Sequence, residues 1–146
     1  MKYNVIFVMA IMLLYGGCKA PSPVQQYEKY DGAKLIIGSG GGFTGEYIDY
    51  IILENGYVFK KSTLDNKLAY LGKLKKNDVL QLFKNYSYLG LNKKNLNMPG
   101  NMNKYIKYIK DGEKHILQWS YEKSKMVAPE IKLFYKIAMK LAGQLK

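Results

Sequence analysis

The stretch Glu46–Lys60, EYIDYIILENGYVFK, decides the fold class of this chain. Its first eight residues are rich in aromatic and β-branched side chains, which is typical of strands. Asn55-Gly56 follows, and a second run of the same kind begins at Tyr57. Asn-Gly between two such runs is the strongest short hairpin signal, because a type I′ turn needs a positive φ at both central residues. The stretch therefore predicts two antiparallel strands joined by a tight turn.

Four further segments predict strands of the same sheet. Lys34–Ile37 is a short apolar run that ends at glycines, and Leu68–Leu74 is a candidate for a strand after the first hairpin. Tyr105–Lys110 and Lys114–Tyr121 flank an Asp-Gly pair, which is the second type I′ signal in the chain. The two hairpin signals together indicate an antiparallel sheet.

Two amphipathic helices are predicted, one between the hairpins and one at the end of the chain. The first begins at Asn77 or Asp78, either of which can cap a helix, and it ends before Gly90. The second begins at Pro129, and its apolar stripe lies opposite a row of lysines. The segment Leu91–Asn103 is rich in Asn and predicts a polar loop.

These elements predict an α+β fold with the order β-β-β(-β)-α-β-β-α. Two tight hairpins imply a single antiparallel sheet of five to six strands, and two one-sided helices imply that both pack on one face of it. The length of 146 residues allows one domain, and 48% hydrophobic residues fit a folded chain. We expect this domain over residues 32–146.

The N-terminal segment predicts export from the cytoplasm. Lys2 precedes ten apolar residues at 5–14, which are too few to span a bilayer and suit the apolar part of a signal peptide. The sequence Gly16-Gly17-Cys18 follows, and it resembles the lipobox of bacterial lipoproteins. The resemblance implies a signal peptide over residues 1–17, cleavage between Gly17 and Cys18, and diacylation of the Cys18 thiol.

A lipid anchor of this kind places the protein in the bacterial cell envelope. Two or more acyl chains hold a protein stably on a membrane, and we expect the outer membrane, with the domain facing the periplasm or the cell surface. Residues 18–31 contain two prolines and mostly polar side chains, which predicts a flexible tether with no core of its own.

Composition argues against several classes of partner and site. The net charge is +12, but every one of the 23 basic residues is Lys. Arg is preferred for contacts to phosphate and guanine, so a chain without it is unlike a nucleic-acid-binding protein. One Cys and one His exclude an internal disulfide and a Cys/His zinc site. No metal or other cofactor is predicted.

No catalytic residue is predicted either. His115 could be a general base only with a nucleophile and an orienting acid within hydrogen-bond reach. Ser120 and Glu122 are close in sequence, but nothing marks them as such a group. We therefore interpret His115 as a structural histidine and the protein as a non-enzyme.

The one conspicuous motif is GSGGGFTG at Gly38–Gly45. A dinucleotide site requires a helix after the glycines, whereas a strand is predicted here. A Walker site requires Lys and then Ser or Thr, and Glu46-Tyr47 occupies those positions. These departures argue against a nucleotide.

Two interpretations of the glycine motif remain. One is a strand connection that uses positive φ angles, and the other is a loop that presents an aromatic residue to a partner protein. In the second case the candidate partner-binding residues are Gly40, Gly41, Gly42, Phe43, Thr44 and Gly45.

The segment Gly41–Gly45 between two strands is similar to the Gly-Gly-Phe-x-Gly signature of the emfourin-like proteins. These are small bacterial α+β proteins associated with inhibition of thermolysin-type (protealysin-like) metallopeptidases. The similarity continues with a helix, an aromatic hairpin and a final helix that Pro129 introduces. The resemblance implies a non-catalytic protein-binding module with such a peptidase as its partner.

An alternative function is contact with a glycan, or a structural role in the envelope, through the Tyr- and Lys-rich strand faces. Tyr105 and Tyr108 of the second hairpin could stack on sugar rings. The competing interpretation is that they are half-buried strand residues with solvated hydroxyls.

Overall fold

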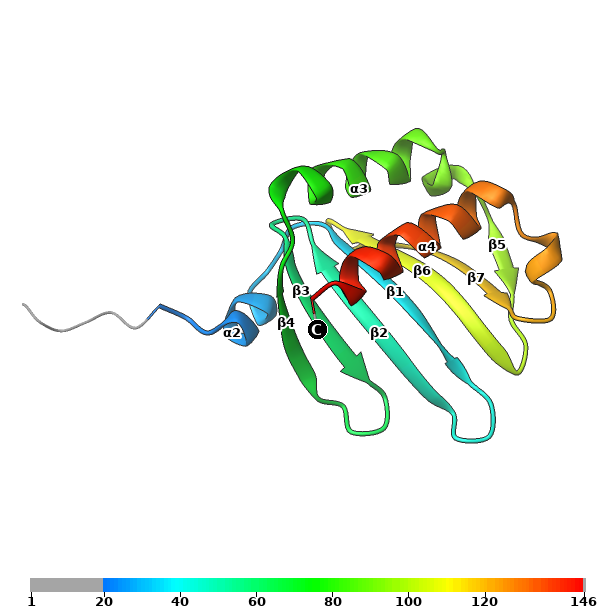
Figure 1. The fold of residues 1–146 in the computed structure, drawn as a ribbon, viewed down its shortest axis with the longest axis horizontal. Helices are drawn as coiled ribbons and strands as arrows, with labels where there is room; N and C mark the ends of the chain where they lie inside the picture. The colour runs from blue at the N-terminus through cyan, green and yellow to red at the C-terminus, as the bar shows by residue number, and fades with distance from the viewer. Residues whose placement is uncertain (1–19, 146) are drawn as a thin grey trace, which may run out of the picture.

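In the part of the chain that the structure describes, one sheet of seven strands and two covering helices form an α+β fold (Figure 1). The computed structural model describes residues 20–145. The strands are β1 (Lys34–Gly41), β2 (Glu46–Leu53), β3 (Tyr57–Ser62), β4 (Leu68–Lys73), β5 (Leu96–Met98), β6 (Met102–Lys110) and β7 (Glu113–Ser120). The α-helices are α2 (Pro23–Glu28), α3 (Lys76–Tyr88) and α4 (Pro129–Gly143), and short 3₁₀ turns lie at Leu91–Lys93 and Ser124–Met126.

The sheet is larger than the sequence predicted and is not purely antiparallel. Its strand order is β4-β3-β2-β1-β6-β7-β5, and every pair is antiparallel except β5 with β7. β5 lies inside the segment Leu91–Asn103, for which a loop was predicted. Its three residues pair with Leu117–Trp119, and so short a strand leaves no periodic signal in the sequence.

The two predicted tight turns differ in their geometry. Asp111 and Gly112 have φ angles of 51° and 79°, as a type I′ turn requires. Of the pair Asn55-Gly56, only Gly56 has a positive φ, at 97°. Its N–H donates to the carbonyl oxygen of Leu53 at 2.8 Å, so the four-residue turn ends on this glycine. The prediction of the first hairpin is therefore confirmed, but the prediction that its turn is of type I′ is wrong.

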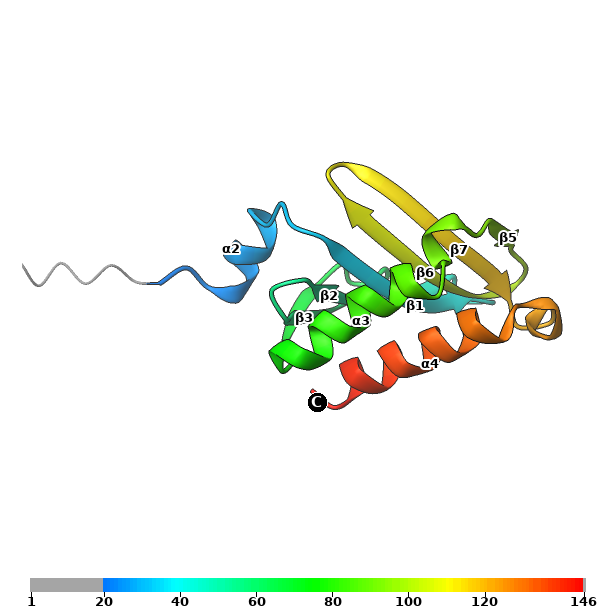
Figure 2. The same cartoon turned by 90° about the horizontal axis from the view of Figure 1, so that it is seen from above.

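The main core lies between the sheet and the helices α3 and α4, which cover the same face (Figure 2). Alternate residues of β1, such as Leu35 and Ile37, point toward these helices and are fully buried. Pro129 begins α4 as predicted. The predicted cap of α3 is wrong, because the helix already begins at Lys76, and the N-cap residue Lys75 makes no side-chain cap.

A smaller core lies on the opposite face of the sheet, where α2 packs. It contains Ile51, Leu53 and Phe59, and the Tyr27 ring of the α2 helix lies 5.1 Å from the Phe59 ring. The Ser22 hydroxyl accepts from the N–H of a residue in the first turn, in a complete capping box. The described part of the predicted tether, residues 20–31, thus contains a short helix that contacts the sheet.

Candidate functional site

The predicted functional residues fall into two groups. Gly17 and Cys18, the predicted cleavage and lipidation positions, lie outside the described residues. The glycine segment is described in full. It forms the end of β1 and the connection to β2, where these strands end at the bottom of Figure 1. β1 was predicted to stop before the glycines, at Ile37, but it continues through Gly41.

Close approach of neighbouring chains requires glycine at the end of β1. A Cβ atom at Gly40 would collide with the backbone oxygen of Glu46 on the paired strand. Gly41 has a φ of +112°, and a Cβ there would collide with the carbonyl oxygen of Asn101. These two glycines therefore serve the packing of β1 against its neighbours.

The turn itself spans Gly42–Gly45. Gly42 and Gly45 have φ angles of 73° and 62°, as the interpretation of a positive-φ connection predicts. The Gly45 N–H donates to the Gly42 carbonyl oxygen at 3.2 Å, and the Gly42 N–H donates to that of Asn101 at 2.9 Å. The Thr44 hydroxyl accepts from the Glu46 N–H at 3.3 Å. These bonds hold the turn in place, with the Phe43 side chain fully exposed at its tip.

The neighbouring loop between β3 and β4 supports the base of this turn. Thr63 exchanges two hydrogen bonds with the Tyr47 backbone, at 2.8 Å and 2.9 Å. The Ser62 hydroxyl donates to the Glu46 carboxylate at 2.8 Å. Leu64 is exposed in the same loop. The β1–β2 and β3–β4 loops are thus linked by hydrogen bonds at the same end of the strands, and both carry an exposed apolar side chain.

Tyr105 is buried on the sheet face opposite α3 and α4, and the sequence did not predict this. It pairs with Gly38 of β1, and a Cβ at that glycine would collide with the Tyr105 ring. The Tyr105 hydroxyl donates to the Asp49 carboxylate, and the Lys107 ammonium lies 4.3 Å from the ring centre. Tyr105 is only 3% exposed, so it presents no surface for stacking.

Tyr108 is engaged as well, on the helix-covered face. Its ring stacks on that of Tyr86 from α3, with the ring centres 4.7 Å apart and the planes 12° apart. Of the two tyrosines on which the glycan interpretation depended, Tyr105 is therefore enclosed by protein groups, whereas Tyr108 is half-buried and lines a surface cleft.

The Tyr105 environment predicts a loss of stability in alkali. Burial, and then the bond to Asp49, raise the pKa of the Tyr105 hydroxyl. The folded state thus holds this proton more tightly than the unfolded state, in which tyrosine titrates near about pH 10. The resulting stabilisation is complete below that pH and falls as the pH rises above it. We expect urea unfolding to show a smaller loss of stability above about pH 10 in Tyr105→Phe than in the wild type. Equal losses in the two proteins would contradict this.

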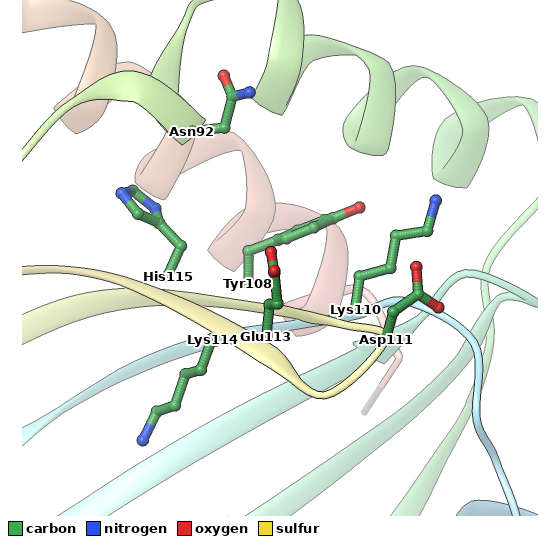
Figure 3. Close-up of a pocket in the computed structure, with 7 residues that line it drawn as sticks. All are labelled: Asn92, Tyr108, Lys110, Asp111, Glu113, Lys114 and His115. Carbon is green, nitrogen blue, oxygen red and sulfur yellow. The ribbon is translucent and has the colours of Figure 1, made fainter.

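A cleft of about 600 Å³ lies beside the turn of the second hairpin, and His115 is one of its lining residues (Figure 3). Figure 3 shows His115 and Tyr108 on the side of the helices and Lys114 on the other side. Both nitrogens of the His115 ring take part in a hydrogen bond. Nδ1 lies 2.5 Å from the Tyr86 hydroxyl, and Nε2 lies 2.8 Å from the Lys94 carbonyl oxygen.

The contact with Lys94 determines which ring nitrogen carries the proton when the His115 ring is neutral. A carbonyl oxygen can only accept, so Nε2 carries the proton and Nδ1 accepts from Tyr86. Both nitrogens of His115 are therefore occupied by structural bonds, which is the role that the sequence predicted. The cleft also mixes charges of both signs, with Lys110 and Asp111 beside each other. Within residues 20–145, no three His, Cys, Asp or Glu side chains are grouped to hold a metal ion.

No protein-family model matches the chain, and no curated protein matches it significantly. The similarity to the emfourin-like signature therefore rests on the quoted residues alone.

Proposed function

We propose that this protein is a lipid-anchored cell-envelope lipoprotein whose domain binds a protein partner and catalyses no reaction. The anchor is Cys18, in the sequence Gly16-Gly17-Cys18. No helix in the described range 20–145 is both long and apolar enough to cross a bilayer. The acyl chains would hold the protein on the membrane, and the domain would meet its partner in the envelope.

The observation that carries the binding function is the full exposure of Phe43 on a fixed turn. Aromatic side chains are common energetic anchors in protein interfaces. Because hydrogen bonds from Gly42 and Gly45 already order this turn, little conformational entropy is lost when a partner covers it. The tip of the β1–β2 connection is therefore well suited to insert an aromatic ring into a pocket of another protein.

A thermolysin-type metallopeptidase is the partner class that the Gly41–Gly45 signature suggests. Mixing such a peptidase with the full chain in a non-ionic detergent should slow substrate cleavage in proportion to the molar ratio. Phe43→Ala should weaken the inhibition about thirtyfold or more, because a buried aromatic anchor contributes about 2 kcal/mol or more.

The matched control for this experiment is Tyr88→Ala. Tyr88 is also an exposed aromatic residue (87%), but it lies at the end of α3. We expect this variant to inhibit as the wild type does. Full inhibition by the Phe43 variant would show that the turn is not part of the interface. If the wild type inhibited none of several such peptidases, this class of partner would be excluded.

A further inference from the structure

A second cleft, of about 440 Å³, lies on the helix-covered side of the sheet. Its walls are the end of β1, the start of β6, the end of β7 with the following loop and 3₁₀ turn, and one side of α4. Ser39, Lys104 and Trp119 line it from the sheet, and Lys132, Tyr135 and Lys136 line it from the helix. The volume is in the range of pockets that bind small molecules.

The charge of this cleft has one sign. Three of its lining residues are lysines, and no Asp or Glu lines it. The Lys104 ammonium lies 4.5 Å from the Tyr121 ring centre and 5.5 Å from that of Tyr135. The Lys132 ammonium donates to the Ser124 carbonyl oxygen at 3.3 Å. In the described chain none of these lysines takes part in a salt bridge, so their charges are available to an anion.

An unpaired buried donor lies in the same wall. Trp119 is 1% exposed, and its indole N–H has no hydrogen-bond partner among the described residues. An indole N–H can only donate, and leaving a buried donor unpaired is costly. The nitrogen has almost no solvent-accessible surface, so an acceptor oxygen in the cleft would reach it only after the side chains around it moved.

The remaining lining groups add donors and a flat apolar wall. The Trp119 and Tyr135 rings meet edge to face, with centres 5.4 Å apart. The Tyr135 hydroxyl donates to the Gly38 carbonyl oxygen at 3.3 Å, and burial raises its pKa. It thus stays neutral at physiological pH and adds no negative charge to repel an anion.

We propose that this cleft binds a small ligand that carries a carboxylate or phosphate group. The anionic oxygens would lie among Lys104, Lys132 and Lys136. The body of the ligand would contact the aromatic wall. This site is separate from the Phe43 turn, and the inference does not depend on the proposed protein partner.

The single tryptophan of the chain makes the test direct, because all tryptophan fluorescence comes from Trp119, which lines this cleft. The full chain, in a non-ionic detergent at constant ionic strength, is titrated separately with inorganic phosphate, glucose 6-phosphate, glucuronate and glucose. We expect a saturable change with at least one of the three anions and none with neutral glucose. The three anions distinguish free phosphate, a phosphate ester and a carboxylate as the recognised group.

Two lysine variants distinguish a site from general attraction to a positive surface. Lys132→Gln and Lys136→Gln should each weaken binding about tenfold, because each removes a charged donor. Lys140→Gln is the matched control, since it removes the same charge from an exposed position of α4 outside the lining. Loss of affinity in all three variants alike, or no saturable change with any anion, would overturn the proposal.

Discussion

Replacing Phe134 with alanine should lower the free energy of unfolding by about 3–5 kcal/mol. Phe134 is fully buried on α4, and its ring meets the Tyr86 ring of α3 edge to face, 5.7 Å away. Both residues belong to the main core between the helices and the sheet. Truncation therefore leaves a cavity where both helices meet the sheet, and close-packed neighbours can fill it only in part. Urea unfolding at neutral pH measures the effect.

Leu133→Ala is the matched control for this prediction. Leu133 precedes Phe134 on the same helix but is 54% exposed. Its truncation should cost less than about 1 kcal/mol. Similar losses in the two variants would mean that α4 presents a different face to the sheet.

The position of Phe134 was predictable because helical periodicity determines which face of α4 is apolar. The same reasoning identified the interior of α3 but not its first residue. A side-chain cap was expected at Asn77 or Asp78, yet the helix begins after Lys75 without one. Packing of the apolar face against the sheet stabilises this helix enough that its first turn forms without a cap.

The extent of β1 and the presence of β5 could not be predicted from local sequence. Glycine has a low strand propensity, so Gly38–Gly41 resembled a loop. The structure gives the reason for these glycines in contacts that are distant in sequence, such as the Tyr105 ring against Gly38. β5 forms only because β7 offers it an edge.

The candidate sites also differ in how far local sequence could predict them. Phe43 was identified because the whole turn is one contiguous motif. The bond between Tyr105 and Asp49 joins residues that are 56 positions apart, and the lysine-lined cleft combines side chains from three strands, α4 and a 3₁₀ turn. A row of lysines on α4 was visible in the sequence, but only the fold brings Lys132 and Lys136 next to Lys104.

The glycine motif has one part that packs against the paired strand, at Gly40, and one part that is exposed, at Gly45. Alanine substitutions at these two positions distinguish the two roles. Gly40→Ala should destabilise the protein by about 3 kcal/mol, because the added methyl group collides with the backbone of the paired strand. A backbone oxygen of a central strand cannot rotate away as a flexible side chain can. The measurement is urea unfolding of the full chain in a non-ionic detergent.

Gly45→Ala is the contrasting variant at the other end of the motif. No atom lies within 4 Å of a Cβ at Gly45, and only its φ of +62° disfavours alanine. This conformation costs a non-glycine residue roughly 1 kcal/mol. We therefore expect a loss about three times as large for Gly40→Ala as for Gly45→Ala. If Gly40→Ala instead unfolded like the wild type and only lost partner binding, then Gly40 would serve the interface rather than the pairing of β1 with β2.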